Sequence, residues 1–312
     1  MVVQEKPLTT LNDVTDLLSP SSGVDRGVYR VRDVAVHATG LALPSHMGLT
    51  ADGRVLVSEY GAGRVRDITE PGDYIDQSMG QHAWNLRHPG GILPLADGRI
   101  LVADSGSGRI YDITTPGAAS AAAIMFEGVD HPYGLFEFRR RIFTSFSNDT
   151  MVGIAEVVPG ECFTTEKHAY VSNFPVVVTA EPYRKLLGCG GHWTGGIKDD
   201  RLLLGHAALG AIFDVTPGGT FDELRNRRYA WGLTMPLGMT TDPLDGSVYV
   251  AERTTGVIKR IPHAGGYSRF AEPILAGFQE PSCARFTPDG TYMYVCDRSW
   301  DTVYRVELEH TS

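Results

Sequence analysis

The chain has 312 residues, of which 42% are hydrophobic and 21% are charged, and its net charge is −9. This composition is typical of a folded globular protein and argues against wholesale disorder. The negative charge disfavours nucleic acid as the main partner, and no apolar run is long enough to cross a bilayer. We therefore expect no nucleic-acid and no membrane partner.

The N-terminal segment from Met1 to Asp16 is polar and carries charges of both signs. Because no basic segment followed by an apolar core is present, it does not resemble a secretory signal. We expect residues 1–26 to form an N-terminal arm, residues 27–312 to form a single domain, and the location to be cytoplasmic. The four cysteines lack the CxxC spacing of thiolate zinc sites, and we expect free thiols at Cys162, Cys189, Cys283 and Cys296.

Six similar units follow one another along the chain. They are separated by 43, 43, 61, 43 and 45 residues and begin at Gly48, Gly91, Gly134, Gly195, Gly238 and Cys283. Within a unit, an apolar run leads through a turn such as Asp97-Gly98 to a second run such as Ile100-Leu101-Val102. Asp-Gly between alternating apolar residues is a strong hairpin signal. Four strands per unit, repeated six times, predict an all-β fold, a six-bladed β-propeller with four-stranded blades.

Ring closure and one insertion can also be predicted. The last unit supplies three strands, and the segment 28–36 upstream of the first unit has the alternation of a spare strand. We expect this N-terminal strand to complete the last blade and so remove an open sheet edge. The longest gap holds roughly 18 extra residues, at about 174–190, which is long for a loop and is a candidate lid or wall of a pocket.

The repeat also allows positions to be compared between blades. Three residues before each unit begins, we predict the start of the innermost strand, at Ser45, His88, His131, His192, Met235 and Glu280. The second strand would return to the same face and end at Glu59, Asp104, Phe146, His206, Glu252 and Asp297. Residues of both sets would therefore meet at one mouth of the central channel.

Histidines from three consecutive blades occupy the first of these positions: His88, His131 and His192. Three neutral imidazoles meeting at one point suit zinc or a similar divalent ion with an open coordination position. The alternative is that each histidine caps the start of its strand through a backbone hydrogen bond. The sequence also leaves a structural calcium ion open.

His206 stands where most other units have an acidic residue, beside the same mouth. It is therefore a candidate fourth metal ligand or acid/base group, and His206 or Tyr60 is the candidate base that removes a proton from the substrate. The recurring carboxylates favour a structural role in turns, with orientation of metal-bound histidines as the alternative.

Aromatic and arginine side chains adjoin the predicted mouth. Tyr133, Trp193, Phe146 and Trp300, together with Tyr60, would suit a ring-bearing small substrate, although blade-to-blade packing is the alternative for Phe146 and Trp300. Arg253 and Arg298 would bind a substrate carboxylate, or else pair with acidic neighbours.

The segments His88-Pro89-Gly90-Gly91 and His131-Pro132-Tyr133-Gly134, with the Asp-Gly-Arg hairpins, resemble NHL-type six-bladed propellers over about residues 28–308. More loosely, they are similar to the virginiamycin B lyase and strictosidine synthase relatives. The resemblance to amidating NHL lyases implies a metal site at the three histidines, and hence a metal-assisted lyase that acts on a small organic molecule at the mouth, in specialised metabolism.

Three other functions stay open. A lactonase-like hydrolase is one, although Leu43-Pro44-Ser45 stands where the gluconolactonase relatives have an early metal-binding glutamate. A metal-free condensation enzyme that uses Glu280 or Glu252, and a non-catalytic binding propeller, are the others.

Overall fold

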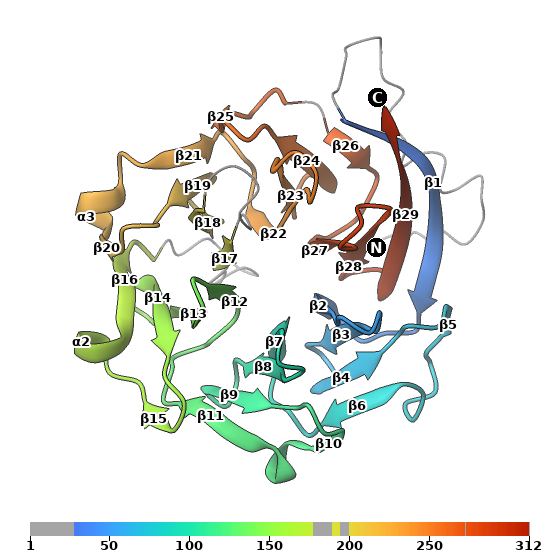
Figure 1. Cartoon of the computed structure of the whole chain (residues 1–312), viewed down its shortest axis with the longest axis horizontal. Coiled ribbons are helices and arrows are strands. Elements are labelled where there is room, and N and C mark those ends of the chain that lie inside the picture. Colours follow the sequence, from blue (N-terminus) through green and yellow to red (C-terminus); the bar gives the residue numbers. More distant parts are fainter. Residues whose placement is uncertain (1–27, 177–188, 194–199, 272, 312) are drawn as a thin grey trace, which may run out of the picture.

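The computed structural model describes residues 28–176, 189–193, 200–271 and 273–311. Six sheets are arranged around a common axis, with one strand of each sheet nearest the axis (Figure 1). The predicted six-bladed propeller is therefore confirmed. The expected arm at 1–26 and most of the expected insertion at 174–190 lie outside the described residues.

The first three blades follow in chain order, each written from the axis outward. The first consists of β2 (Pro44–Leu49), β3 (Val55–Glu59), β4 (Arg64–Asp67) and β6 (Gln81–Trp84). The second consists of β7 (Pro89–Pro94), β8 (Ile100–Asp104), β9 (Arg109–Asp112) and β11 (Ala123–Glu127). The third consists of β12 (Leu135–Phe138), β13 (Arg141–Ser147), β14 (Val152–Val157) and β16 (Ala169–Phe174).

The other three blades complete the ring. The fourth consists of β17 (Cys189–Trp193), β18 (Leu202–His206), β19 (Ala211–Asp214) and β21 (Arg228–Trp231). The fifth consists of β22 (Pro236–Thr241), β23 (Val248–Glu252), β24 (Val257–Ile261) and β26 (Pro273–Ala276). The sixth combines β27 (Pro281–Phe286), β28 (Tyr292–Asp297) and β29 (Thr302–Thr311) with β1 (Val28–Thr39) from the other end of the chain.

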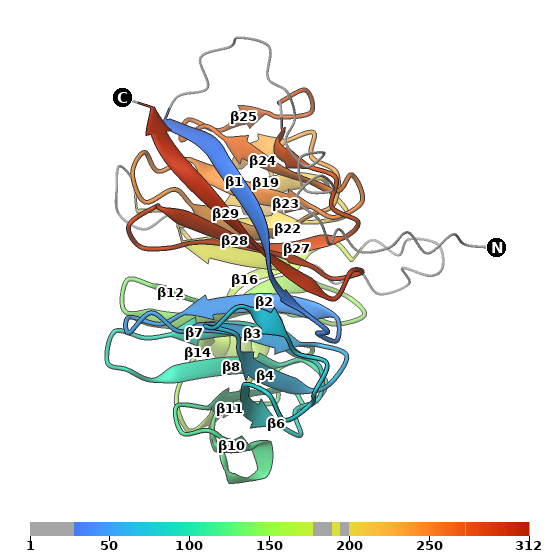
Figure 2. The same ribbon diagram turned by 90° about the vertical axis from the view of Figure 1, so that its right-hand side faces the viewer.

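The pairing of β1 with β29 closes the ring, as the sequence predicts. The two strands are antiparallel, with Val31 opposite Leu308 and Val36 opposite Tyr304, and they run side by side along the molecule (Figure 2). Because the first and last parts of the chain share one sheet, opening the ring would break a long ladder of backbone hydrogen bonds.

Five of the outer strands are covered by a feature that the sequence analysis missed. A two-residue strand from the following blade pairs in parallel with the outermost strand of its neighbour. These strands are β5 (Gly72–Asp73), β10 (Gly117–Ala118), β15 (Glu161–Cys162), β20 (Gly219–Thr220) and β25 (Gly266–Tyr267). They cover sheet edges that would otherwise expose unpaired backbone groups. Within the described residues, three short helices also lie in the outer loops: η1 (Ala119–Ala121), α2 (Thr165–His168) and α3 (Phe221–Leu224).

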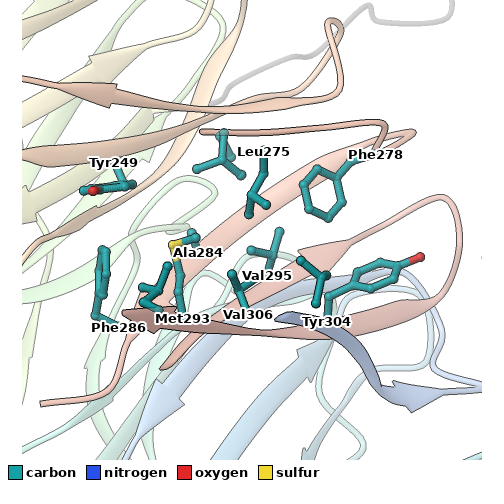
Figure 3. Packing of buried hydrophobic residues seen from close by; sticks show 13 residues of the cluster. Tyr249, Leu275, Phe278, Ala284, Phe286, Met293, Val295, Tyr304 and Val306 are labelled. Carbon is teal, nitrogen blue, oxygen red and sulfur yellow. The ribbon is translucent and has the colours of Figure 1, made fainter. Parts of the chain in front are cut away.

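The hydrophobic core lies between neighbouring blades. Between the fifth and sixth blades, the Tyr249 ring meets the Phe286 ring edge-on at 4.9 Å, and Met293 and Val295 belong to the same buried cluster (Figure 3). Near the axis the blades approach so closely that side chains are excluded. A Cβ atom on Gly91 would lie 2.6 Å from the backbone nitrogen of Leu135, and one on Gly238 would lie 2.5 Å from the carbonyl oxygen of Ser282. These glycines therefore fix how tightly the inner strands pack.

Among the described residues, the structure shows no helix long and apolar enough to span a bilayer. Three cysteines of the described part are free thiols: Cys162, Cys283 and Cys296.

Candidate functional site

A shared turn precedes the innermost strand of most blades. Four residues there have a left-handed backbone and are each followed by proline, with φ of 52° at Leu43, 63° at His88, 42° at His131 and 49° at Met235. Such conformations are costly for residues other than glycine, and they persist only where the surrounding structure imposes them. Backbone hydrogen bonds brace three of these turns, because the N–H that follows the second strand donates to the carbonyl of the left-handed residue at 3.2 Å in the pairs Tyr60–Leu43, Ser105–His88 and Arg253–Met235. The Arg298 N–H donates to the Glu280 carbonyl in the same way, at 3.0 Å.

These pairs, together with His131, Asn148 and Ala207 at the corresponding strand ends of the third and fourth blades, define a ring of residues on one axial face, which we call the mouth ring. It comprises the residues before the first strands (Leu43, His88, His131, Met235, Glu280) and those after the second strands (Tyr60, Ser105, Asn148, Ala207, Arg253, Arg298). In the first blade, Leu43 and not Ser45 is the counterpart of His88, because Pro44 pairs with Glu59 as Pro89 pairs with Asp104.

The register of the fourth blade corrects the predicted alignment of three histidines. Cys189 pairs with His206, the counterpart of Asp104, so Cys189 holds the position of Pro89, the residue after His88. His192 lies three residues beyond Cys189, opposite Leu203, and is therefore four positions beyond the level of His88, which is about 13 Å at roughly 3.3 Å per residue. The expectation that the three histidines share one level is therefore wrong, and the fourth unit begins four residues earlier than the glycine pattern indicates.

The residues predicted to hold a metal thus do not fit a common ion. His88 and His131 do occupy equivalent positions and are both exposed, whereas the side chain of His192 lies outside the described residues. Within the described ranges, no three His, Cys, Asp or Glu side chains form a group that could hold a metal ion. We derive no chemical step through a metal, and a zinc or calcium ion stays a prediction.

Three mouth-ring side chains from consecutive blades contact one another. The rings of Tyr60 and His88 are stacked, with centroids 4.6 Å apart and planes 15° apart, and the Arg298 guanidinium lies over the Tyr60 ring at 4.6 Å. Burial raises the pKa of the Tyr60 phenol, and the positive charge of Arg298 opposes that rise. The phenol is therefore protonated at neutral pH. We call this set the Tyr60 stack.

A pocket of about 340 Å³ opens beside the Tyr60 stack. Its walls include Tyr60, His88, Leu86, Arg87 and the glycine turn that starts at Gly61. An aromatic platform beside an exposed imidazole is a suitable surface for a ring-bearing ligand.

The two arginines that were predicted to bind a carboxylate differ in their surroundings. Arg253 forms an ion pair with Glu280, whose carboxylate also accepts a hydrogen bond from Ser299 at 2.5 Å. Arg298 has no carboxylate within ion-pair distance among the described residues, and its side chain contacts the Tyr60 ring. Of the two predicted arginines, Arg298 is thus the one that forms no ion pair within the described residues.

A second polar layer lies further along the axis, where the first strand bulges by one residue. The Tyr133 hydroxyl and the Ser45 hydroxyl are 2.6 Å apart, and the ring of His46 meets that of Tyr133 edge-on at 4.9 Å. His46 is only 4% exposed, and its Nδ1 has no hydrogen-bond partner. Burial, together with the charges of Arg285 and Arg298, lowers the pKa of His46 to about 3, so its imidazole is neutral at physiological pH.

His46 and Arg285 are the functional candidates that the sequence analysis missed. Once Pro44 is aligned with Pro89, His46 occupies the position of Gly91, which is Gly238 in the fifth blade and Cys283 in the sixth. A histidine at the glycine position of one repeat was the available signal, and it was hidden because the first unit was aligned two residues too late, on Gly48.

His206 has no nitrogen free for chemistry. Its Nε2 donates to the carbonyl of Pro175 at 2.9 Å, and its Nδ1 accepts from the N–H of Leu209 at 3.2 Å. Burial lowers its pKa, which keeps this neutral tautomer. The contacts place His206 as a structural link between loops.

The recurring carboxylates also bind backbone. Glu59, Asp104 and Glu252 each accept the N–H of a residue just before the first strand, from Ala42, Arg87 and Thr234 respectively. Asp297 does the same twice, and burial raises its pKa to about 6. The structural interpretation of these residues agrees with the contacts.

The remaining predicted residues do not gather at the mouth. In the third blade Ser147, and not Phe146, is the counterpart of Asp104, because it pairs with Val152 as Asp104 pairs with Arg109. Phe146 therefore faces the core, where it is 1% exposed and packs on Phe163 at 5.1 Å. Trp300 packs against the cluster between the fifth and sixth blades. The side chain of Trp193 lies outside the described residues.

Comparisons with known proteins agree on the fold. No protein-family model and no curated protein matches the sequence. Among solved structures, a gluconolactonase from Xanthomonas campestris has 11% identity over 94% of this chain and 98% of its own, with a TM-score of 0.58. A PQQ-bound aldose sugar dehydrogenase from Streptomyces coelicolor has 16% identity over 92% and 100%, with a TM-score of 0.59. A virginiamycin B lyase from Staphylococcus aureus, in complex with quinupristin, has 14% identity over 85% and 80%, with a TM-score of 0.50.

These similarities confirm a six-bladed propeller that resembles virginiamycin B lyase and gluconolactonase, and at such identities they establish the fold alone.

Proposed function

We propose that the protein is an enzyme that acts on a ring-bearing small organic molecule at the mouth ring, with lyase chemistry. The observation that supports this proposal is the Tyr60 stack, which sets a protonated phenol and an exposed imidazole in the wall of one pocket. Over the phenol ring lies an arginine that has no carboxylate partner among the described residues. The three groups come from three different blades, so no single repeat needs them for its own folding.

The side chains have complementary proton-transfer roles. The exposed imidazole of His88 accepts the proton from the carbon next to a substrate carbonyl. The electron pair of that C–H bond forms a C=C bond as the neighbouring carbon–oxygen bond breaks. The leaving oxygen takes its proton from Tyr60, whose raised pKa keeps the phenol available as a donor. The product of such a ring opening is an isomer of its cyclic substrate.

A hydrolase is the second candidate, because the similarity to a gluconolactonase extends over nearly the whole of both chains. The same imidazole would then take a proton from water, and the product would gain the elements of water. A metal at His88 and His131, which this account does not need, is a separate prediction.

Turnover of a panel of cyclic depsipeptides and lactones, including quinupristin and gluconolactone, tests the proposal by mass spectrometry of the products. We expect an isomeric ring-opened product and a loss of at least about a hundredfold in kcat/KM in the His88→Ala variant. The exposed Arg32→Gln variant, far along β1, is the matched control and retains full activity. Products that gain water would replace the lyase by the hydrolase. Full activity of His88→Ala, or no turnover of any member, would overturn the assignment and favour a binding propeller.

A further inference from the structure

We infer that the pocket beside the Tyr60 stack continues outward into a second pocket, between the first and second blades, which binds an anionic group of the same ligand. The anionic group is a carboxylate or a phosphate, and Arg87 and Arg109 are the residues that bind it. The inference rests on the proposed function, because it specifies the substrate class as a molecule with a ring at one end and a negative charge at the other.

The second pocket is a cavity of about 470 Å³ whose walls come from three segments. Asn85 and Arg87 belong to the link between β6 and β7, Arg109 and Tyr111 belong to β9, and the short helix η1 forms the third wall. Both arginines therefore line one space, and its volume is large enough for part of a small organic molecule.

The two pockets share a wall, because Arg87 and Gly106 line both of them. The Gly106 N–H donates to the Arg87 carbonyl at 2.6 Å, and a Cβ atom on Gly106 would also lie 2.6 Å from that oxygen. A side chain is therefore excluded at Gly106, and the shared wall is bare backbone at this point. A ligand whose ring lies beside Tyr60 can pass over this wall, next to Arg87, into the second pocket.

The lining of the second pocket contains two arginines, Arg87 and Arg109, and one carboxylate, Asp104. The Asp104 side chain is buried, and its two oxygens accept hydrogen bonds from the Arg87 N–H at 2.7 Å and from the Ser107 hydroxyl at 2.6 Å. This carboxylate therefore holds the turn. The exposed Arg87 forms no ion pair within the described residues. The lining thus has a surplus of positive charge on a protein whose net charge is −9, and this surplus favours an anionic ligand group.

Arg109 has an acidic neighbour that competes with a ligand. Its Nε donates to Glu127 Oε2 at 3.2 Å, and the two side chains are 41% and 45% exposed. Exposed ion pairs of this kind are weak, and Glu127 is not among the residues that line the pocket. Removal of the Glu127 charge should therefore strengthen the binding of an anion, whereas removal of the Arg109 charge should weaken it.

Two phenyl-substituted acids, 4-phenylbutyrate and 6-phenylhexanoate, and their uncharged amides are the probes, and isothermal titration calorimetry on the full chain is the measurement. The two acids place the carboxylate at different distances from the ring. We expect at least one acid to bind at least about tenfold more tightly than its amide, because only the acid offers a charge-assisted partner. Tighter binding of 4-phenylbutyl phosphate than of 4-phenylbutyrate would support the same pocket and assign a phosphate to it.

Three variants locate the anion. Arg109→Gln is expected to remove the preference for the acid, and Glu127→Gln is expected to increase it severalfold, because the competing carboxylate is gone. Arg32→Gln, an exposed arginine elsewhere, is expected to keep the wild-type preference. Since the first two changes act in opposite directions, poor folding of a variant cannot imitate the expected pattern.

Equal binding of each acid and its amide would overturn the anion pocket. A preference for the acid that Arg109→Gln leaves unchanged, or that Glu127→Gln weakens, would overturn it as well. These outcomes differ from failure of the proposed function, in which the preference and its loss in Arg109→Gln are present but no member of the substrate panel is turned over.

Discussion

Replacement of His88 by glycine tests whether its imidazole serves catalysis or the folding of the second blade. If His88 caps the start of β7, its removal should destabilise the blade. If its ring serves a ligand, the backbone should tolerate the change, because glycine adopts a φ of 63° without strain.

Three contributions determine how His88→Gly changes the free energy of unfolding. Relief of the left-handed conformation gains about 1–2 kcal/mol, the added flexibility of glycine in the unfolded chain costs about 0.5–1 kcal/mol, and loss of the stack on Tyr60 costs about 0.5–1.5 kcal/mol. These nearly cancel, so we expect the free energy of unfolding to change by less than about 1 kcal/mol, while turnover is lost.

Urea denaturation followed by circular dichroism measures the stability change. Leu43→Gly is the matched control, because Leu43 holds the equivalent position of the first blade with a φ of 52°. Both variants should unfold at nearly the wild-type urea concentration, and His88→Gly should lose activity. A destabilisation of His88→Gly by more than about 2 kcal/mol, at the level of a lost cap, would refute the reasoning.

Three further predictions concern the fold and the inner layer. Gly91→Ala should destabilise the protein by about 2 kcal/mol or more in thermal unfolding, because the added Cβ would lie 2.6 Å from backbone. The control Gly117→Ala should be nearly neutral, because its Cβ would have no neighbour within 4 Å, and equal effects of the two variants would contradict the close packing at Gly91. A double-mutant cycle of Tyr133→Phe and Ser45→Ala should give a coupling free energy of unfolding of about 1 kcal/mol. Absence of coupling would contradict the 2.6 Å hydrogen bond between the two hydroxyl groups. The pKa of His46 is lowered in the folded state, so the unfolded state binds the extra proton and stability is lost as pH falls below about 6.5. Urea denaturation between pH 7 and 6 should show this loss, with a smaller slope in His46→Gln, and an unchanged slope would contradict it. Burial also lowers the pKa of three other histidines, so each of them likewise contributes a loss of stability as the pH falls: His37, His82 and His206.

The architecture could be predicted because each sequence repeat shows which residues form strands and which form turns. Asp-Gly hairpins and apolar alternation recur at nearly constant spacing, and each repeat can bury its faces only against its neighbours. The closing strand was predictable for the same reason, since the sixth unit lacks its outer strand and β1 supplies it. The two-residue strands that cover the outer edges were not, because two residues carry no periodicity.

The candidate site was harder to predict, because it depends on register at single-residue precision. The prediction aligned units on glycines, but the innermost strands of four blades contain a bulge near their start, and the described strand of the fourth blade pairs without one. A shift of one residue turns a side chain from the axis into the core, as at Phe146 and Ser147. Positions just before a proline at the strand start, such as His88 before Pro89 and Glu280 before Pro281, were placed correctly, and so was Arg298, whose N–H binds the Glu280 carbonyl.

Labelling with diethyl pyrocarbonate tests the mouth site most directly, because the reagent acylates exposed neutral imidazoles and mass spectrometry of peptides locates the label. The account predicts that His88 and His131 are labelled in the free protein, and that a compound of the substrate panel that is turned over protects His88 while His131 stays reactive as the internal control. Labelling of His88 that such a compound leaves unchanged would contradict the account.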